Sequence, residues 1–169
     1  VDLQMQAGSN AMIEERIKQE FREIADENGL KNNITVFTDA RGVVVRIMDK
    51  AFYDEGKADL KQGAKNALDK IIPIMKDIKN HIRIEGHTDN IPINTSAYPS
   101  NWELSSARAS SAVRFLIENG MDINKIAALG YAETKPLVDN NSDTNRAKNR
   151  RVEIIITNNN SVQKSLDEY

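Results

Sequence analysis

The chain has 169 residues, with 23 Lys or Arg, 25 Asp or Glu and a formal net charge of −2. A chain of this length can bury one core with extra helix, and its charge gives no general attraction to nucleic acid or anionic membranes. The lack of cysteine excludes a disulfide scaffold, and the presence of only two histidines disfavours a multi-histidine metal site. The sequence contains no run of about 18 apolar residues, so we predict no membrane-spanning helix within it.

The N-terminal part divides into two segments. Residues 1–11, VDLQMQAGSNA, lack a hydrophobic period and resemble vector-derived sequence, so we leave them out of the fold. Residues 12–30 are expected to form a stalk or linker helix that Gly29 can end. Its apolar stripe could pack on the domain or against a second copy in a homodimer, and the sequence leaves both open. The stripe consists of Ile13, Ile17, Phe21, Ile24 and Ala25.

Residues 31–158 are expected to form a single domain, followed by a flexible, Asn- and Ser-rich tail at 159–169. The domain begins with two β-rich runs, 34–38 and 43–48. The four residues between them, Asp39-Ala40-Arg41-Gly42, favour a hairpin because Asp and Gly suit tight turns.

The middle of the domain alternates between helix and strand. Residues 51–57 have little period and are predicted as a loop, whereas 59–79 carry an apolar face at helical spacing. Pro73 lacks the N–H that would reach the carbonyl of Asp69, so we expect a kink or break there. Residues 82–86 alternate as a strand does.

The next helix has clear end signals. Ser100-Asn101-Trp102-Glu103 fits a capping box that starts the helix near Asn101, and Asn119-Gly120 can end it. Trp102 is expected in the core, and stacking of its ring on a glycan is the alternative. The remaining elements are a strand at 125–131, a brief helix capped by Asp143 or Thr144, and a strand at 151–157.

The order hairpin, helix, strand, helix, strand, short helix, strand predicts an α/β (α+β) fold. We expect a mixed β-sheet with helices packed on one face, plus the N-terminal helix. The continuous run Ile154-Ile155-Ile156 indicates a central strand that is covered on both sides.

Two opposite charges mark a candidate binding site. Asp89 follows the strand at 82–86, at the end where α/β sheets usually bind ligands. Arg108 lies in the second turn of the next helix, and its guanidinium can reach the N-terminal end of that helix. An anionic group beside a cationic one can hold a zwitterion. The same two residues could instead form a structural ion pair, and their spacing does not decide between these roles.

Three sequence blocks, IEGHTDN at 84–90, NWELSSARA at 101–109 and NRRVEIII at 149–156, together resemble the OmpA-like peptidoglycan-binding domain. The resemblance covers about residues 34–157. It implies that Asp89 and Arg108 bind the free end of diaminopimelate, a zwitterion, in the stem peptide of the cell wall. Thr88, Asn101 and Arg150 match further family positions and are implied to border the same pocket.

The loop at 90–100 is longer than in typical outer-membrane members and resembles the MotB family of flagellar stator proteins. This resemblance implies an extracytoplasmic domain that anchors a stator to peptidoglycan, with no cofactor. It also implies a membrane helix upstream of Met12 and a MotA-like ion-channel subunit as partner. The alternative is an OmpA-like envelope anchor that has no motor.

Enzymatic and nucleic-acid functions are weaker interpretations. His87 and Asp89 with a serine could suggest a hydrolase triad, including a cell-wall hydrolase, but no G-x-S-x-G motif occurs. The basic residues at 146–151 lack interleaved aromatic side chains, which disfavours a nucleic-acid partner. We therefore expect a binding protein with no catalytic residue and no metal.

Overall fold

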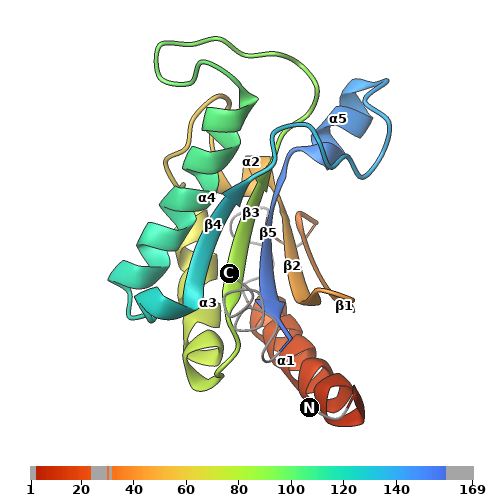
Figure 1. Cartoon of the computed structure of the whole chain (residues 1–169), viewed down its shortest axis with the longest axis vertical. Coiled ribbons are helices and arrows are strands. Elements are labelled where there is room, and N and C mark those ends of the chain that lie inside the picture. Colours follow the sequence, from red (N-terminus) through yellow and green to blue (C-terminus); the bar gives the residue numbers. More distant parts are fainter. Residues whose placement is uncertain (1–2, 24–29, 31, 159–169) are drawn as a thin grey trace, which may run out of the picture.

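A computed structural model describes residues 3–23, 30 and 32–158. In this part of the chain the strands form one sheet in the order β1-β2-β5-β3-β4 (Figure 1). The β3–β4 pair is parallel and the other pairs are antiparallel, so the sheet is mixed, as predicted. The strands are β1 (Ile34–Asp39), β2 (Gly42–Met48), β3 (Ile82–His87), β4 (Ile126–Gly130) and β5 (Arg151–Thr157).

The longer helices cover one face of this sheet, which confirms the predicted architecture. Figure 1 shows α3 and α4 along the sheet, and α2 and α5 at the end opposite α1. No helix among the described residues has the length and apolar character that a bilayer crossing requires. The helices are α1 (Leu3–Glu23), α2 (Asp49–Phe52), α3 (Gln62–Asp77), α4 (Asn101–Glu118) and α5 (Asp143–Asn149), with a 3₁₀ turn, η1 (Ile123–Lys125), before β4.

The hydrophobic core lies between the sheet and α1, α3 and α4. Alternate residues of β5 enter it, because successive side chains of a strand point to opposite faces. Ile154, Ile155 and Ile156 are all fully buried, so the predicted central, doubly covered strand is confirmed.

Helix α1 begins earlier than predicted, at Leu3 and not at Met12. Residues 3–11 were left out of the fold because they lack an apolar period, but α1 includes them. Asn10 is buried, and its amide donates to the side-chain oxygen of Asn158 just after β5 (2.9 Å). This contact with a distant segment holds the first turns in place. The predicted end of the helix lies outside the described residues.

The apolar stripe of α1 packs on its own domain. Ile13 and Ile17 are buried in the core, and Phe21 packs against it partly buried. Ile24 and Ala25 lie outside the described residues. The homodimer stays a prediction, but Ile13 and Ile17 do not support it, because the chain itself already covers them.

Three local predictions were wrong. Part of the predicted loop at 51–57 belongs to the one-turn helix α2. Of the kink or break expected at Pro73, the break does not occur: helix α3 continues through this exposed proline, because the buried residues on both sides outweigh one lost backbone hydrogen bond. Trp102 is half exposed instead of lying in the core.

The predicted start of α4 is confirmed, and that of α5 is shifted by one residue. The Ser100 hydroxyl accepts from the Trp102 N–H (3.2 Å) and bonds the Glu103 carboxylate, which caps α4. Helix α5 is capped by Ser142, whose hydroxyl accepts from the Asn145 N–H (3.1 Å), and not by Asp143 or Thr144.

Helix α4 lies unusually close to β3. A Cβ atom added to Gly86 would lie 2.2 Å from the backbone oxygen of Ser105, so only glycine fits this strand position. The Ser105 hydroxyl also accepts from the backbone N–H of Ala132 (3.1 Å). These contacts fix the N-terminal half of α4 beside the end of β3, which brings the predicted Asp89 and Arg108 to one place.

Substitution of Gly86 by Ala should lower the free energy of unfolding by about 1–3 kcal/mol, because the added methyl group must push the α4 backbone away. Urea denaturation measures this change. Gly8→Ala is the control: nothing lies within 4 Å of that position in α1, so stability should stay equal or rise by up to about 1 kcal/mol. A Gly86→Ala protein as stable as wild type would contradict the close approach.

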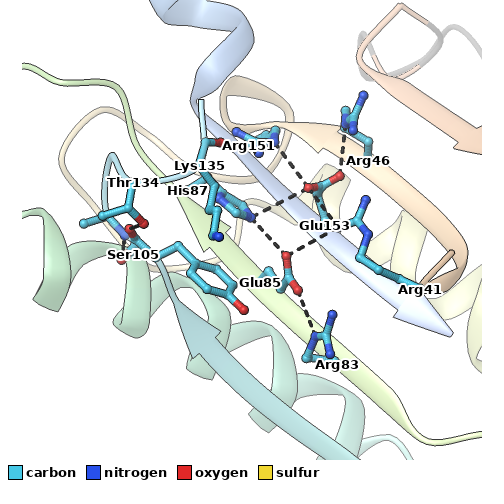
Figure 2. Close-up of polar contacts among 12 residues, drawn as sticks. Arg41, Arg46, Arg83, Glu85, His87, Ser105, Thr134, Lys135, Arg151 and Glu153 are labelled. Carbon is cyan, nitrogen blue, oxygen red and sulfur yellow. Dashed lines mark hydrogen bonds and ion pairs between the residues drawn. The ribbon is translucent and has the colours of Figure 1, made fainter. Parts of the chain in front are cut away.

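The other face of the sheet carries a network of charged side chains (Figure 2). Glu153 accepts from Nε of Arg46 (3.0 Å) and of Arg151 (3.4 Å), and Glu85 accepts from Nε of Arg83 (2.8 Å). Burial would raise the pKa of Glu153, but Arg151 and Arg46 hold it below its usual value. Both carboxylates therefore stay ionised.

His87 completes this network as a neutral group. Its ring stacks on Tyr131 (5.2 Å between centroids), and its Nε2 lies 3.2 Å from Oε1 of Glu85 and 3.7 Å from Oε1 of Glu153. Burial lowers the pKa of His87 below its usual value, although the hydrogen bond to Glu85 opposes this. The folded protein therefore resists protonation of this ring.

A lowered histidine pKa makes stability depend on pH. Below about pH 6.5 the unfolded chain binds a proton at His87 that the folded chain does not bind. As the pH is lowered, the free energy of unfolding should therefore fall by at most about 1.4 kcal/mol per pH unit. Urea melts at pH 7.5 and 5.5 test this. His87→Gln should show a smaller fall than wild type. Equal falls in the two proteins would exclude His87 as the cause.

Candidate ligand-binding site

A cavity of about 500 Å³ opens at the C-terminal end of β3. Its walls come from α2 and the loop after it, from the segment after β3, and from α4 and α5. Figure 1 shows these segments gathered at one end of the sheet. The structure brings together all five predicted site residues in this wall: Thr88, Asp89, Asn101, Arg108 and Arg150.

The charged groups of the pocket form a chain of alternating sign. Asp89 Oδ2 lies 2.7 Å from Nη1 of Arg150, whose Nε lies 3.6 Å from Oδ2 of Asp49. The same oxygen of Asp49 lies 3.1 Å from Nη1 of Arg108. Among the described residues Asp89 and Arg108 form no direct ion pair, so the simple pairing considered from their spacing is not the one observed.

Asp49 is the member of this chain of charges that the sequence analysis missed. It directly follows β2, and β2 pairs with β5 so that Met48 lies opposite Arg151. Its backbone N–H donates to the carbonyl of Arg150 (3.1 Å). The hairpin was predicted, but only the position of β5 beside β2 could have shown that Asp49 lies next to Arg150.

Arg108 is fixed at the pocket floor, with a side chain that is 4% exposed. Its Nε–H donates to the carbonyl of Lys57 (2.8 Å), and Nη2 donates to that of Asp54 (3.2 Å). The guanidinium lies 4.9 Å from the centroid of the Tyr53 ring, and the Tyr53 hydroxyl donates to the Arg108 carbonyl (2.7 Å). A group held by so many contacts can bind a ligand without losing further side-chain entropy.

Asp89 is held by its own loop. Its Oδ1 accepts from the backbone N–H of Ile91 (2.9 Å), and its carbonyl accepts from the Thr88 hydroxyl (2.8 Å). The amide of Asn101 donates to the carbonyl of Ile91 (3.0 Å). In this structure Thr88 and Asn101 therefore shape the loop, while Asp89 presents the charge.

Arg150 is the most open member of the charged chain, with a side chain that is 36% exposed. Burial would lower its pKa, but the hydrogen bond to Asp89 and the charge of Asp49 raise it above its ordinary value. Two permanent cations therefore face two carboxylates. This balance suits a ligand that carries both an ammonium and a carboxylate.

Glu85, His87 and Glu153, which are buried on the face of the sheet away from the hydrophobic core, form a group whose spacing would allow a metal ion. Its carboxylate oxygens already pair with arginines, including Arg41, which lies 3.5 Å from Glu85 and 3.4 Å from Glu153. The guanidiniums repel a divalent cation, and they already occupy the lone pairs that would bind it. This group is therefore best explained as an internal ion network.

His87 and Asp89 do not form a catalytic pair. The His87 ring contacts Glu85 and Tyr131 on the face of the sheet away from the hydrophobic core, whereas Asp89 contacts Arg150 and the Ile91 backbone in the pocket. No hydroxyl nucleophile bonds to His87 among the described residues. The triad considered from the sequence is therefore not assembled.

Solved structures of other proteins share this fold. The cell wall anchor of the T6SS from Pseudomonas aeruginosa matches with a TM-score of 0.74 and 29% identity, over 84% of this chain and 96% of that one. The periplasmic domain of Helicobacter pylori MotB matches with a TM-score of 0.68 and 25% identity, over 80% of this chain and 88% of that one.

Sequence comparison points the same way. Motility protein B of Bacillus subtilis (strain 168) is 34% identical over 151 residues, which are 84% of this chain and 55% of that protein. The chain spans about half the length of the curated relatives it matches. The OmpA family matches residues 52–150, a segment that runs from the last residue of α2 to the residue before β5. Of the four central charged residues of the pocket, this segment contains Asp89, Arg108 and Arg150 but not Asp49. With more than half of its length matched in this way, the chain belongs to the OmpA family.

Proposed function

We propose that this protein binds peptidoglycan without cleaving it, by holding the zwitterionic end of diaminopimelate in the stem peptide. The main support is the pocket at the end of β3, where two carboxylates alternate with two guanidiniums. Family membership and the similarity to a protein described as a cell wall anchor support the same ligand.

Each charged group has a defined part in this proposal. The ligand ammonium would bind Asp89, whose carboxylate faces the pocket. The ligand carboxylate would bind Arg108 at the floor, with Arg150 beside it. Thr88 and Asn101 would hold the loop that carries Asp89 in its binding position. In such an arrangement the ligand replaces ion pairs within the protein. No covalent bond is broken, so no catalytic group is needed.

We further propose that the protein is the extracytoplasmic part of a flagellar stator subunit. Its similarity to Motility protein B and to a periplasmic MotB domain supports this, as does the long loop at 90–100. Residues 31–158 would be the wall-binding domain and 12–30 the linker to a membrane helix. A MotA-like ion-channel subunit would be the partner.

A second candidate is a cell-wall anchor for an envelope assembly that has no motor. The similarity to the T6SS anchor supports it, because that structure covers a similar share of the chain at a higher TM-score than the MotB domain. Both candidates use the same pocket. Motility of a strain that lacks this protein separates them, since only a stator subunit is required for swimming.

Asp89→Asn should weaken binding to purified sacculi by about ten- to a hundredfold, because it removes one charge-assisted contact. Arg108→Lys should do the same, since lysine keeps the charge but cannot form the guanidinium contacts. Co-sedimentation with sacculi measures both. Arg114→Ala, an exposed change on the same helix, is the control and should bind as wild type does. Undiminished binding by the two site variants would refute the assignment of the pocket.

The chemistry of the wall gives a separate test. Sacculi that contain diaminopimelate should bind better than sacculi that contain lysine at the same position, because lysine lacks the terminal carboxylate that Arg108 would hold. Titration of the protein against both wall types measures the difference. Equal affinities would remove Arg108 from that role and move recognition to the glycan.

A further inference from the structure

Asp49 stands between the two cations of the pocket. Its Oδ2 lies 3.1 Å from Nη1 of Arg108 and 3.6 Å from Nε of Arg150, and its side chain is 13% exposed. The backbone holds it there, because its N–H donates to the Arg150 carbonyl and its carbonyl accepts from the Tyr53 N–H (2.8 Å). A carboxylate thus occupies the place between the groups that a ligand carboxylate needs.

The position of Asp49 decides the charge of the pocket. With Asp49 and Asp89 against Arg108 and Arg150, the four central groups sum to zero. A zwitterion leaves that sum unchanged, whereas a simple anion makes it −1. Without Asp49 the sum would be +1, and a simple anion would be attracted. Within a few ångströms and partly out of water, one unit charge changes affinity by an order of magnitude or more.

We propose that Asp49 is a specificity-determining residue, which makes the pocket reject simple anions and accept zwitterions. This inference rests on the proposed function, since it concerns the same pocket and ligand class. Asp49 neutralises one of the two guanidiniums in the free protein, so a carboxylate ligand binds well only when it brings its own ammonium. That requirement distinguishes the free end of diaminopimelate from the many other carboxylates of a cell wall.

The rest of the pocket rim does not disturb this balance. Lys50, Glu55, Asp143 and Arg146 also line the pocket, and their four charges sum to zero. Arg146 is already paired with Asp143. The selectivity therefore depends on the four central groups. Among them, Asp49 pairs with both guanidiniums, and the ligand ammonium is assigned to Asp89 and not to Asp49.

The test compares two ligands by calorimetry on the whole chain. One is a stem tetrapeptide that contains diaminopimelate, and the other is the same peptide with its free amine acetylated, which leaves a simple anion. Wild type should prefer the free amine by at least about tenfold. In Asp49→Asn the acetylated peptide should bind more tightly, and the preference for the free amine should fall about tenfold. Asp49→Glu, which keeps the charge, should retain the wild-type preference.

A second variant tests the same balance from the other side. Arg150→Gln changes the summed charge of the central groups to −1. It should therefore weaken binding of the acetylated peptide more than binding of the zwitterion, and so raise the preference for the free amine. Its side chain is exposed enough for the protein to fold without it. If Asp49→Asn keeps the wild-type preference, the role of Asp49 is refuted. If Asp49→Asn does not fold, an unchanged preference in Arg150→Gln refutes it instead. If wild type binds neither peptide nor sacculi, the proposed function itself fails.

Discussion

The insertion of β5 between β2 and β3 places Arg150 between the two carboxylates of the pocket. Arg151 lies opposite Met48 on one side and opposite His87 on the other. The residue before it, Arg150, is therefore brought beside Asp49 and within reach of Asp89. A slip of one residue in either pairing would turn the side chains of β5 to the wrong face. The same pairing thus fixes the core and the site.

The two faces of β5 contribute to the fold in different ways. Val152, Ile154 and Ile156 enter the core, where their burial stabilises the protein by about 2 kcal/mol each. Glu153, on the other face, is opposite Arg46 in one pairing and opposite Glu85 in the other. A buried ion network adds little net stability because desolvation offsets the attraction. It does penalise any other register, since a shifted strand would bury these charges without partners.

The sequence predicted the parts of the site that depend on local signals. Asp89 and Arg108 were found because a strand end and a capping box place them. Asp49 was missed because its contacts depend on the order of the strands, which no local pattern decides. The early start of α1 was missed for a similar reason, since the contact of Asn10 joins segments at opposite ends of the chain. At Pro73 the expected break failed because tertiary packing overrides local preference.

The four central charges of the pocket are already paired with one another, and this limits how tightly one site can bind. Each new contact replaces an internal one, such as that between Arg108 and Asp49, so affinity is the difference between two similar sets of ion pairs. A modest affinity at each site suits an anchor that must be placed and released. Firm attachment would then come from several copies bound to one continuous polymer, because linked sites raise the effective concentration for each further contact. Under the proposed function, selectivity would come from each pocket, where the balance of four charges would admit a zwitterion and oppose a simple anion.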